Sequence, residues 1–497
     1  EKREFCGPVS PIVLLEEKKR SLISSQVAPG LTQIGVMLPY APLYELLLHT
    51  FQKPIVATSG NISNSPIVFQ DNQALAELPE IADFLLMNNR EIVIPQDDSV
   101  IKFSPFKKEK IVLRRSRGLA PTYINSDLIL PKACILATGA MLKSSFGFLH
   151  EGNTYLSQYL GDLAHFDTLE NYRHTIEHFF RLFNAKPEVI LCDKHPDYPS
   201  TRYAEEMAAS FEIPVHHIQH HIAHFGAVLG ENNQIESKTP VLGVIWDGTG
   251  LGDDGQIWGG EFFIYENYSF LRAHHFTYFD SILGDKMARE PRISALAACR
   301  GIESATELLK GKFTPTEWKI YTKILSGGTR LQTSSVGRIF DAVAALLDLK
   351  DIQSYEGEAA LLLEQLATEY CKKNGLGFLS SYSYSTMDIL STKGMLREII
   401  EDIQQGESPA FIAAKLHFSL AEMIGVIARK KQIKKIAFSG GVFQNGLLVD
   451  LIWHLLGDEF ELFFHKQLSP NDENIAFGQM VCYEVGLLGD SDNHAKG

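Results

Sequence analysis

Cysteine is scarce in this sequence. Six cysteines occur among 497 residues, and no two of them form a CxxC pair. Disulfide frameworks and cysteine-based zinc modules both need closely spaced cysteines. The composition therefore argues against a disulfide-rich fold and against a zinc finger in this chain. It favours a reducing compartment, which we take to be the cytoplasm.

Basic residues are also too few for one large class of function. Lys and Arg number 46 against 60 Asp and Glu, which gives a net charge of −14, and no long block of like charge occurs. A general nucleic-acid binder usually presents a basic face. We therefore expect no nucleic-acid partner.

Long apolar runs are missing as well. A membrane-spanning helix needs about 18 apolar residues, and the longest candidate, residues 411–428, is interrupted by Lys415, His417 and Glu422. The first 17 residues lack the apolar core and cleavage site of a signal peptide. We therefore expect no membrane association. Because the chain begins at Glu1 rather than Met, we also expect it to be the later part of a longer protein.

Short runs rich in Val, Ile and Leu alternate with helically spaced segments, which indicates an α/β protein. A polar, proline-flanked stretch at 120–132 reads as a linker. After it, residues 133–158 and 241–266 each read as an apolar strand, a glycine-containing turn and a second strand. This repeat predicts two similar lobes that face one cleft, an arrangement that resembles the duplicated actin/Hsp70-like fold. Two unrelated α/β domains are the alternative.

A histidine pair is the sharpest candidate for chemistry. His220 and His224 are four residues apart, so on a helix their side chains share one face. Two imidazoles at that spacing can bind one divalent metal if a carboxylate completes the ligand set. Asp247 and Asp472 each stand where an apolar strand or turn passes into a loop or helix. A helix with amphipathic histidines is the alternative.

Two glycine-rich loops, residues 247–255 and 438–446, each follow an apolar strand. Glycine lets backbone N–H groups approach phosphate oxygens closely, and the second loop runs into a predicted helix N-terminus. Neither loop matches the GxxxxGK[ST] phosphate-binding motif. The pattern predicts a nucleotide site of another type, with Gly248 and Gly250 in its first loop.

A third candidate lies in the first 128 residues. Ser59 and Asn61 stand in a turn after a predicted strand, and Arg115 and Arg117 belong to a basic cluster at 114–118. Ser and Asn can hydrogen-bond a phosphate or ribose, and Arg can neutralise a phosphate. An ordinary turn beside a solvated basic cluster is the alternative.

These motifs together resemble the HypF carbamoyltransferases of nickel–iron hydrogenase maturation, from about residue 8 to about residue 485. The later half of that family's YrdC-like domain resembles GVMLP (35–39), TSGNIS (58–63) and LRRSRG (113–118). Its TsaD-like domain resembles CDKHPDYPSTRYA (192–204), QHHIAH (219–224), WDGTGLGDDGQIWGGE (246–261), SGGVFQN (439–445) and PNDENIAFGQ (470–479).

The resemblance implies a partial YrdC-like domain at 1–128 and a TsaD-like, actin/Hsp70-like domain at 129–497, with lobes at about 129–238 and 239–497. It implies that ATP with Mg and carbamoyl phosphate give carbamoyl-adenylate, and that the carbamoyl group then passes to the C-terminal cysteine of the partner HypE. A divalent metal such as Fe or Zn would assist in the TsaD-like domain.

The resemblance also implies roles for individual residues. Ser59, Asn61, Arg115 and Arg117 would hold the adenylate or its phosphates, and Gly440, Gly441 and Asn445 would line a nucleotide pocket. The catalytic metal would be held by His220, His224 and Asp472, with Asp247 as a further ligand or a phosphate-side group.

The sequence also departs from the family pattern. The family's acylphosphatase-like domain, its zinc module and the early half of its YrdC-like domain have no counterpart here. We therefore expect this chain to carry out the transfer step from preformed carbamoyl-adenylate. An O-carbamoyltransferase, a tRNA threonylcarbamoyl-transfer enzyme and a non-catalytic, nucleotide-binding scaffold for HypE are the alternatives.

Overall fold

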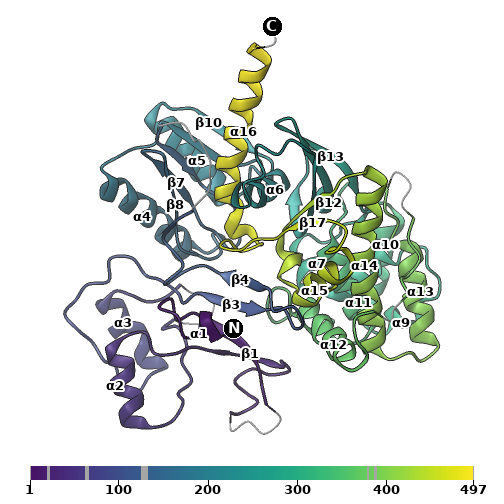
Figure 1. Ribbon diagram of the computed structural model, residues 1–497. Coiled ribbons are helices and arrows are strands. Elements are labelled where there is room, and N and C mark those ends of the chain that lie inside the picture. Colours follow the sequence, from purple (N-terminus) through teal and green to yellow (C-terminus); the bar gives the residue numbers. More distant parts are fainter. Residues whose placement is uncertain are drawn as a thin grey trace. The chain divides into compact units, whose positions relative to one another are not determined.

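The computed structural model describes residues 2–18, 23–61, 66–124, 133–377, 380–385 and 389–495 (Figure 1). The chain divides into two compact units. The first comprises Glu1–Lys102, Val112–Ile218 and Gln467–Glu484, and the second comprises Phe103–Ile111, Gln219–Lys466 and Val485–Gly497. Helices and strands occur in both units, so the predicted α/β class is confirmed. The predicted domain boundary at 128/129 lies outside the described residues.

A four-stranded sheet holds the N-terminal region together. Its strand order is β2-β1-β3-β4, and β1 pairs antiparallel with β2 and parallel with β3. Val13 of β1 lies beside Ile101 of β3, and both side chains are buried. The elements of this region are α1 (Lys2–Phe5), β1 (Ile12–Glu16), β2 (Gln33–Val36), α2 (Pro42–Phe51), α3 (Asp71–Glu77), η1 (Leu78–Glu80), β3 (Val100–Phe103) and β4 (Lys110–Arg114).

The first unit also contains a six-stranded sheet with the order β10-β9-β6-β7-β8-β5. Strands β6, β9 and β10 run parallel, whereas β6, β7, β8 and β5 form antiparallel pairs. Its elements are β5 (Thr122–Tyr123), β6 (Ile135–Ala137), β7 (Gly147–His150), β8 (Asn153–Leu156), α4 (Phe166–Phe183), β9 (Val189–Asp193), α5 (Pro199–Phe211) and β10 (Val215–Ile218).

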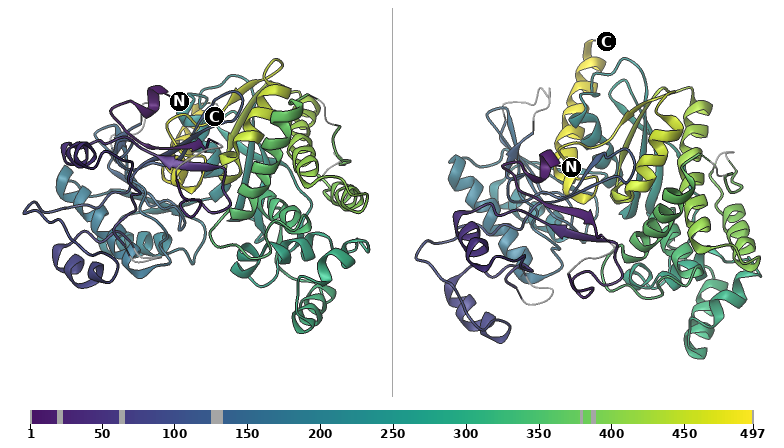
Figure 2. Two further views of the ribbon diagram at one scale, coloured as in Figure 1. Left: turned by 90° about the horizontal axis from the view of Figure 1, so that it is seen from below. Right: turned by 60° about the horizontal axis from the view of Figure 1, so that its bottom comes forward.

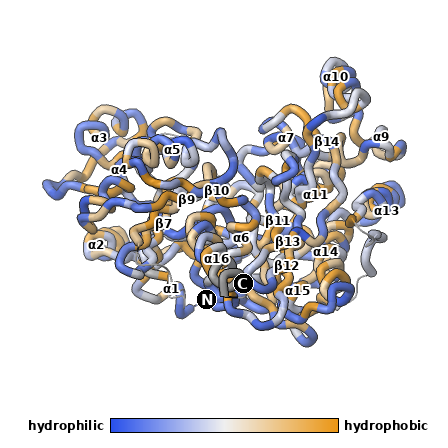
Figure 3. The backbone as a smooth tube through the Cα atoms, turned by 90° about the horizontal axis from the view of Figure 1, so that it is seen from above, coloured by the Kyte–Doolittle hydropathy of each residue, from blue (hydrophilic) through white to orange (hydrophobic). Residues whose placement is uncertain are grey.

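The centre of this six-stranded sheet is almost wholly apolar. Every residue of β6 and β9 is buried, as expected for parallel strands that are covered on both faces. Figure 3 shows β7 and β9 as hydrophobic, orange stretches of the backbone. Ala476 and Met480, on the first turns of α16 (Ile475–Ala495), pack against these strands and close one side of the core.

The second unit is built on a seven-stranded sheet. Its order is β14-β15-β12-β11-β16-β17, with β13 paired to β12. The central strand β11 pairs antiparallel with β12 and parallel with β16, and β16 pairs parallel with β17. The strands are β11 (Val241–Leu251), β12 (Ile257–Glu266), β13 (Ser269–His275), β14 (Phe279–Asp280), β15 (Gln332–Thr333), β16 (Lys435–Ser439) and β17 (Glu461–Phe463).

The two larger sheets share one strand arrangement. In the first, β8, β7 and β6 form an antiparallel meander that continues into parallel β9 and β10. In the second, β13, β12 and β11 form the same meander and continue into parallel β16 and β17. The repeat predicted from the two strand–turn–strand segments is therefore present in the fold.

Helices surround the sheet of the second unit. Helices α11, α12, α13 and α14 lie side by side, and they form the green bundle of Figure 2. The helical elements of this unit are α6 (His220–Glu231), α7 (Asp285–Arg289), α8 (Pro291–Ala298), α9 (Ala305–Lys310), α10 (Pro315–Ser326), α11 (Val336–Leu346), α12 (Glu358–Asn374), α13 (Lys393–Gln404), α14 (Pro409–Lys431), η2 (Gly441–Gln444) and α15 (Gly446–Leu456).

Helix α14 is the one helix of the described residues that is long and apolar enough to cross a membrane. Its most apolar window is 72% buried inside the protein. Ser408 caps its first turn by accepting the Phe411 N–H, and Pro409 occupies the first helical position. The burial of this window matches that of a core helix.

Candidate metal centre

The predicted histidine pair lies on α6, which starts at His220. The Gln219 side chain caps this helix, because its Oε1 accepts the Ile222 N–H at 2.8 Å. The helix packs closely on β11, where a Cβ on Gly243 would lie 2.7 Å from the Phe225 ring. This close packing buries both predicted ligands, which are 1% exposed at His220 and 0% exposed at His224.

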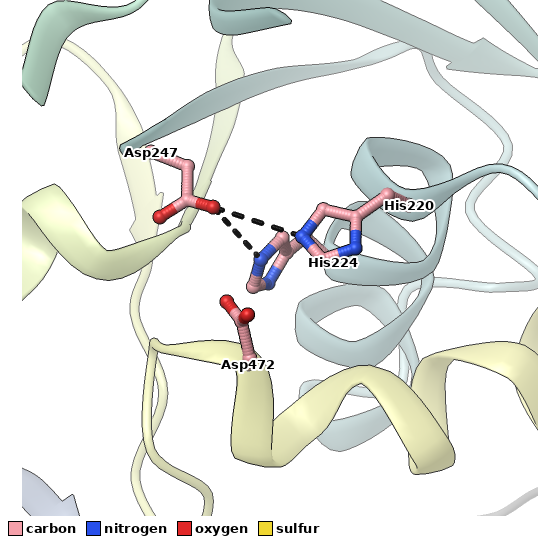
Figure 4. A group of neighbouring side chains, drawn as sticks. All are labelled: His220, His224, Asp247 and Asp472. Atoms are coloured by element: carbon pink, nitrogen blue, oxygen red, sulfur yellow. Dashed lines mark ion pairs between the residues drawn. The ribbon is translucent and has the colours of Figure 1, made fainter. Parts of the chain in front are cut away.

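Asp247 faces the two imidazoles from β11, at an irregularity in the pairing of that strand with β12 between Trp246 and Gly250. Such irregularities re-aim side chains. The Asp247 Oδ1 accepts the Gly441 N–H at 3.1 Å. Its Oδ2 lies 3.7 Å from Nε2 of His220 and 3.8 Å from Nε2 of His224 (Figure 4).

These distances fit a shared metal ion. Both Nε2–Oδ2 separations exceed hydrogen-bond length, whereas two metal–ligand bonds of about 2.0–2.2 Å through one ion can span up to about 4.4 Å. One ligand atom from each of His220, His224 and Asp247 lies within 4.8 Å of the others. Two nitrogens and one carboxylate oxygen are ligands that Fe, Zn and Mn all accept.

The charge state of Asp247 also suits a metal ligand. Burial by itself would raise the pKa of this carboxyl group, but the two imidazoles more than offset that effect and hold the pKa well below its usual value. The carboxylate therefore stays ionised at neutral pH, which is the state that binds a cation.

Two of the predicted nucleotide-loop glycines stand where the elements around His220 and Asp247 pack closely. A Cβ on Gly250 would lie 2.4 Å from Cε1 of His221 and 2.8 Å from Cδ2 of His220. Gly440 has a φ of +101°, and a Cβ there would lie 2.2 Å from the Trp246 carbonyl oxygen. Glycine at both positions therefore lets α6 and β16 approach β11 closely.

The other predicted loop residues also have partners within the protein. Gly441 donates its N–H to the carboxylate, as described above, and Gly248 has its carbonyl held by the Ser335 hydroxyl at 2.7 Å. Asn445 caps α15, since its Oδ1 accepts the Leu448 N–H, and its Nδ2 lies 2.8 Å from Nε2 of His417. Its side chain is thus engaged within the protein.

Asp472, the fourth predicted ligand, is drawn with the other three in Figure 4 and lies at the start of η3 (Asp472–Asn474) in the first unit. Its neighbour Glu473 is wholly buried and accepts the Arg115 backbone N–H at 2.9 Å. Burial raises the pKa of Glu473 to about 7, although Arg115 opposes that shift.

Ser59 and Asn61 line a cavity of about 280 Å³ inside the first unit. The Ser59 hydroxyl donates to Oδ1 of Asn61, so the two side chains form one polar wall. Residues 62–65 of the same motif lie outside the described residues. The other polar or charged side chains that line this cavity belong to Asp97, Arg114, Tyr159, Asp162, His165, Thr168 and Asn171.

The two predicted arginines have partners within the protein. Arg115 is 1% exposed and donates to Thr122 Oγ1 at 2.8 Å. Arg117 pairs with Asp98 at 2.7 Å and stacks its guanidinium on the Tyr40 ring. Arg114, the first residue of the cluster at 114–118, is the member of this cluster that lines the cavity with Ser59 and Asn61.

Three side chains behind His224 are not among the site residues expected from the sequence. Ser439, His465 and Glu231 are buried residues of the second unit that connect in series to His224. Each of these three residues lies at or just beyond the end of a helix or strand that could be predicted. Polar residues are common at such positions, so their presence there was not a signal. A hint was available only for Glu231, which stands seven residues after His224 and so on the same helix face.

Family models match three consecutive segments of the chain. They are described as "Telomere recombination" (the Sua5, YciO and YrdC group) over residues 5–116, "HypF Kae1-like domain" over 131–231, and "Carbamoyltransferase, Kae1-like Domain, second subdomain" over 243–479. These matches confirm the YrdC-like part and the actin/Hsp70-like part that the sequence predicted.

Curated relatives match along nearly the whole chain. Carbamoyltransferase HypF of Synechocystis sp. is 35% identical over 95% of this chain, and carbamoyltransferase HypF of Rhodobacter capsulatus is 33% identical over 97%. The chain spans 63% of the length of each of these two relatives.

Solved structures of similar proteins agree. A crystal structure of full-length HypF in a phosphate- and nucleotide-bound form matches 97% of this chain and 75% of its own, with a TM-score of 0.87 and 33% identity. HypF of T. kodakarensis matches 98% of this chain and 64% of its own, with a TM-score of 0.88 and 31% identity.

Proposed function

The chain belongs to the HypF carbamoyltransferase family, and from this premise we propose that it transfers a carbamoyl group to the C-terminal cysteine of HypE in nickel–iron hydrogenase maturation. The group derives from carbamoyl phosphate and ATP through carbamoyl-adenylate. The solved relative with bound phosphate and nucleotide supports the use of such substrates.

The observation that carries the proposal is the buried trio His220, His224 and Asp247. Its two Nε2 atoms converge on one carboxylate oxygen, and the Gly441 N–H holds the other oxygen in place. We assign Asp472 as the fourth ligand, which gives a set of two His and two Asp. A bound divalent ion such as Fe or Zn would polarise the carbamoyl carbonyl and bind phosphate oxygens.

The proposed transfer needs only the acceptor cysteine and carbamoyl-adenylate as reactants. The sulfur of the acceptor cysteine attacks the carbamoyl carbon, and the bond from that carbon to the phosphate oxygen of the adenylate breaks. AMP leaves with the bonding electrons, and the thiol proton passes to solvent. The backbone of the loop at 438–446 is our candidate for contacts with the nucleotide, because it follows β16 and leads into α15.

We assign the cavity lined by Ser59, Asn61 and Arg114 to the phosphate or ribose of the adenylate. Arg114 is 28% exposed at its side chain and bonds to the Asp98 carbonyl, which holds the guanidinium at the cavity. Arg115 and Arg117 directly follow β4, and we propose that they act by fixing the end of this strand, which carries Arg114. An Arg114→Gln variant should bind AMP about 10-fold more weakly by calorimetry, whereas unchanged AMP binding would refute this assignment.

The transfer itself is tested by mass spectrometry of the HypE C-terminal peptide. We expect the protein to add one carbamoyl group to HypE when carbamoyl-adenylate is supplied. The variants His220→Ala and Asp247→Asn should abolish that addition and lose bound metal. His274→Gln, which replaces a buried imidazole on β13, is the matched control and should retain both properties.

The same experiment separates an enzyme from a non-catalytic scaffold. A protein that binds AMP and HypE but never modifies the cysteine would contradict transfer and favour the scaffold. Transfer at the parent rate by both site variants would show that the trio is not the reaction centre.

A further inference from the structure

A chain of buried polar side chains extends from His224 away from Asp247. Ser439 Oγ lies 3.4 Å from Nδ1 of His224 and 2.9 Å from Nε2 of His465. Nδ1 of His465 lies 2.6 Å from Oε2 of Glu231. Ser439 is 0% exposed, and the side chains of His465 and Glu231 are 2% and 0% exposed. Buried groups of this kind are costly unless they are hydrogen-bonded.

The fold brings these residues together by regular geometry. Ala437 pairs with Phe463 across the parallel strands β16 and β17, and Ser439 and His465 each stand two residues further along. Ser439 is the last residue of β16, so its side chain points to the same face as that of Ala437, whereas His465 lies two residues beyond the end of β17. Glu231 stands two helical turns after His224 on α6, so both face the same side of that helix.

The chain has a defined hydrogen-bond direction when His465 is neutral. A carboxylate only accepts, so Nδ1 of His465 carries the proton that Glu231 accepts, and Nε2 of His465 accepts the Ser439 hydroxyl. The remaining lone pairs of Ser439 Oγ then accept the Nδ1 proton of His224. Nε2 of His224, which lies 3.8 Å from Asp247 Oδ2, keeps its lone pair.

Glu231 is itself held in place by the backbone. Its Oε1 accepts the Lys466 N–H at 2.9 Å, so the two carboxylate oxygens have separate donors. A carboxylate can accept both protons, whereas a Gln side chain would direct its amide NH2, which is a donor, at one of the two donors. The carboxylate is therefore the group that sets the direction of the whole chain.

We infer that Glu231, His465 and Ser439 are positioning residues that fix the tautomer and orientation of His224 so that its Nε2 binds a divalent cation. This inference rests on the proposed metal site. Residues that bond the second nitrogen of a metal-binding histidine typically change metal affinity 10- to 100-fold when they are replaced.

The test is a Zn²⁺ titration of metal-stripped protein against a chromogenic chelator. Ser439→Ala removes both bonds of the hydroxyl and should weaken Zn²⁺ binding about 10- to 100-fold. Ser439→Thr keeps the hydroxyl and should restore most of that affinity. Glu231→Gln keeps almost the same side-chain volume but no longer fixes the direction of the hydrogen bonds. It should therefore weaken Zn²⁺ binding about 10-fold. Circular dichroism checks that each variant is folded.

A spectroscopic measurement separates positioning from a general structural role. The visible absorption of bound Co²⁺ reports the geometry of its ligands, so it should change in Ser439→Ala and Glu231→Gln but not in the buried-histidine control His274→Gln. Parent-like Zn²⁺ affinity and Co²⁺ spectra in both variants, with affinity lost in His224→Ala, would overturn the positioning chain alone. Parent-like affinity in His224→Ala would instead overturn the metal site of the proposed function, and the chain with it.

Discussion

The two larger sheets have the same strand arrangement but very different central strands. In the first unit β6 has three residues, all apolar and buried. In the second unit β11 has eleven residues, and its pairing with β12 is interrupted between Trp246 and Gly250, where Asp247 projects. Among the described residues, the metal-type trio occurs in the second unit. A duplicated topology thus supplies a scaffold, and a longer, irregular strand in one copy supplies the chemistry.

Replacing Asp247 is the strongest test of this difference. Asp247→Asn keeps the shape of the side chain but removes its charge, so we expect a loss of carbamoyl transfer of about 100-fold or more. We expect only a small change in the free energy of unfolding of the metal-stripped protein. A urea titration beside the HypE mass assay checks both values, and a variant that transfers normally would mean that β11 carries no catalytic group.

Glu473 in the first unit and Asp341 in the second unit are buried acids whose titration should affect stability. Burial raises the pKa of Glu473 in the first unit to about 7, from 4.5, and that of Asp341 in the second unit to about 6, from 3.8. A raised carboxyl pKa means that the folded protein binds the proton more tightly. The stabilisation that the protonated carboxyl group provides is fully present below its pKa in the unfolded state. It is lost as the pH rises through the pKa of that group in the folded state.

We therefore expect the parent protein to lose stability relative to Glu473→Gln between about pH 4.5 and 7, and relative to Asp341→Asn between about pH 4 and 6. Each loss should be on the order of 3 kcal/mol. Chemical denaturation of metal-stripped protein across this range measures both. Differences that do not vary with pH would contradict the raised pKa values.

Gly250→Ala tests whether close packing of α6 on β11 is what shapes the trio. The added Cβ would overlap His220 and His221, so we expect a destabilisation of about 1–3 kcal/mol and weaker Zn²⁺ binding. Gly377→Ala is a matched control in the same unit, because a Cβ there would approach only the His454 ring, at 3.4 Å. Normal Zn²⁺ affinity in Gly250→Ala would show that the imidazoles tolerate displacement.

The smallest expected effect concerns the two hairpin turns, where the sheets should behave alike. Gly152 joins β7 to β8 with a φ of +77°, and Gly255 joins β11 to β12 with a φ of +75°, and both have open space around the Cβ position. Alanine at either site should cost about 1–2 kcal/mol, because a side chain disfavours this backbone region. Thermal denaturation of the two variants should give similar shifts, and Zn²⁺ binding should stay unchanged in both.

The glycine loops show how far local pattern could be interpreted. Glycine after an apolar strand led to the prediction of backbone donors near a phosphate, and the sequence did not reveal which parts of the protein pack there. In the structure Gly250 admits two imidazoles and Gly441 holds the Asp247 carboxylate. The cluster at 114–118 has the same limitation, since adjacent arginines have similar local surroundings in sequence, whereas the fold buries Arg115 and leaves Arg114 at the cavity.

The sequence by itself determined the α/β class, the repeated strand–turn–strand segments and the pairing of His220 with His224, because these depend on periodicity over a few residues. Only the tertiary structure decided that Asp247 faces both imidazoles and that Ser439, His465 and Glu231 connect behind them. These contacts join segments that are distant in the sequence, and their geometry depends on sheet register and on how closely α6 packs against β11. No local pattern encodes either of those quantities.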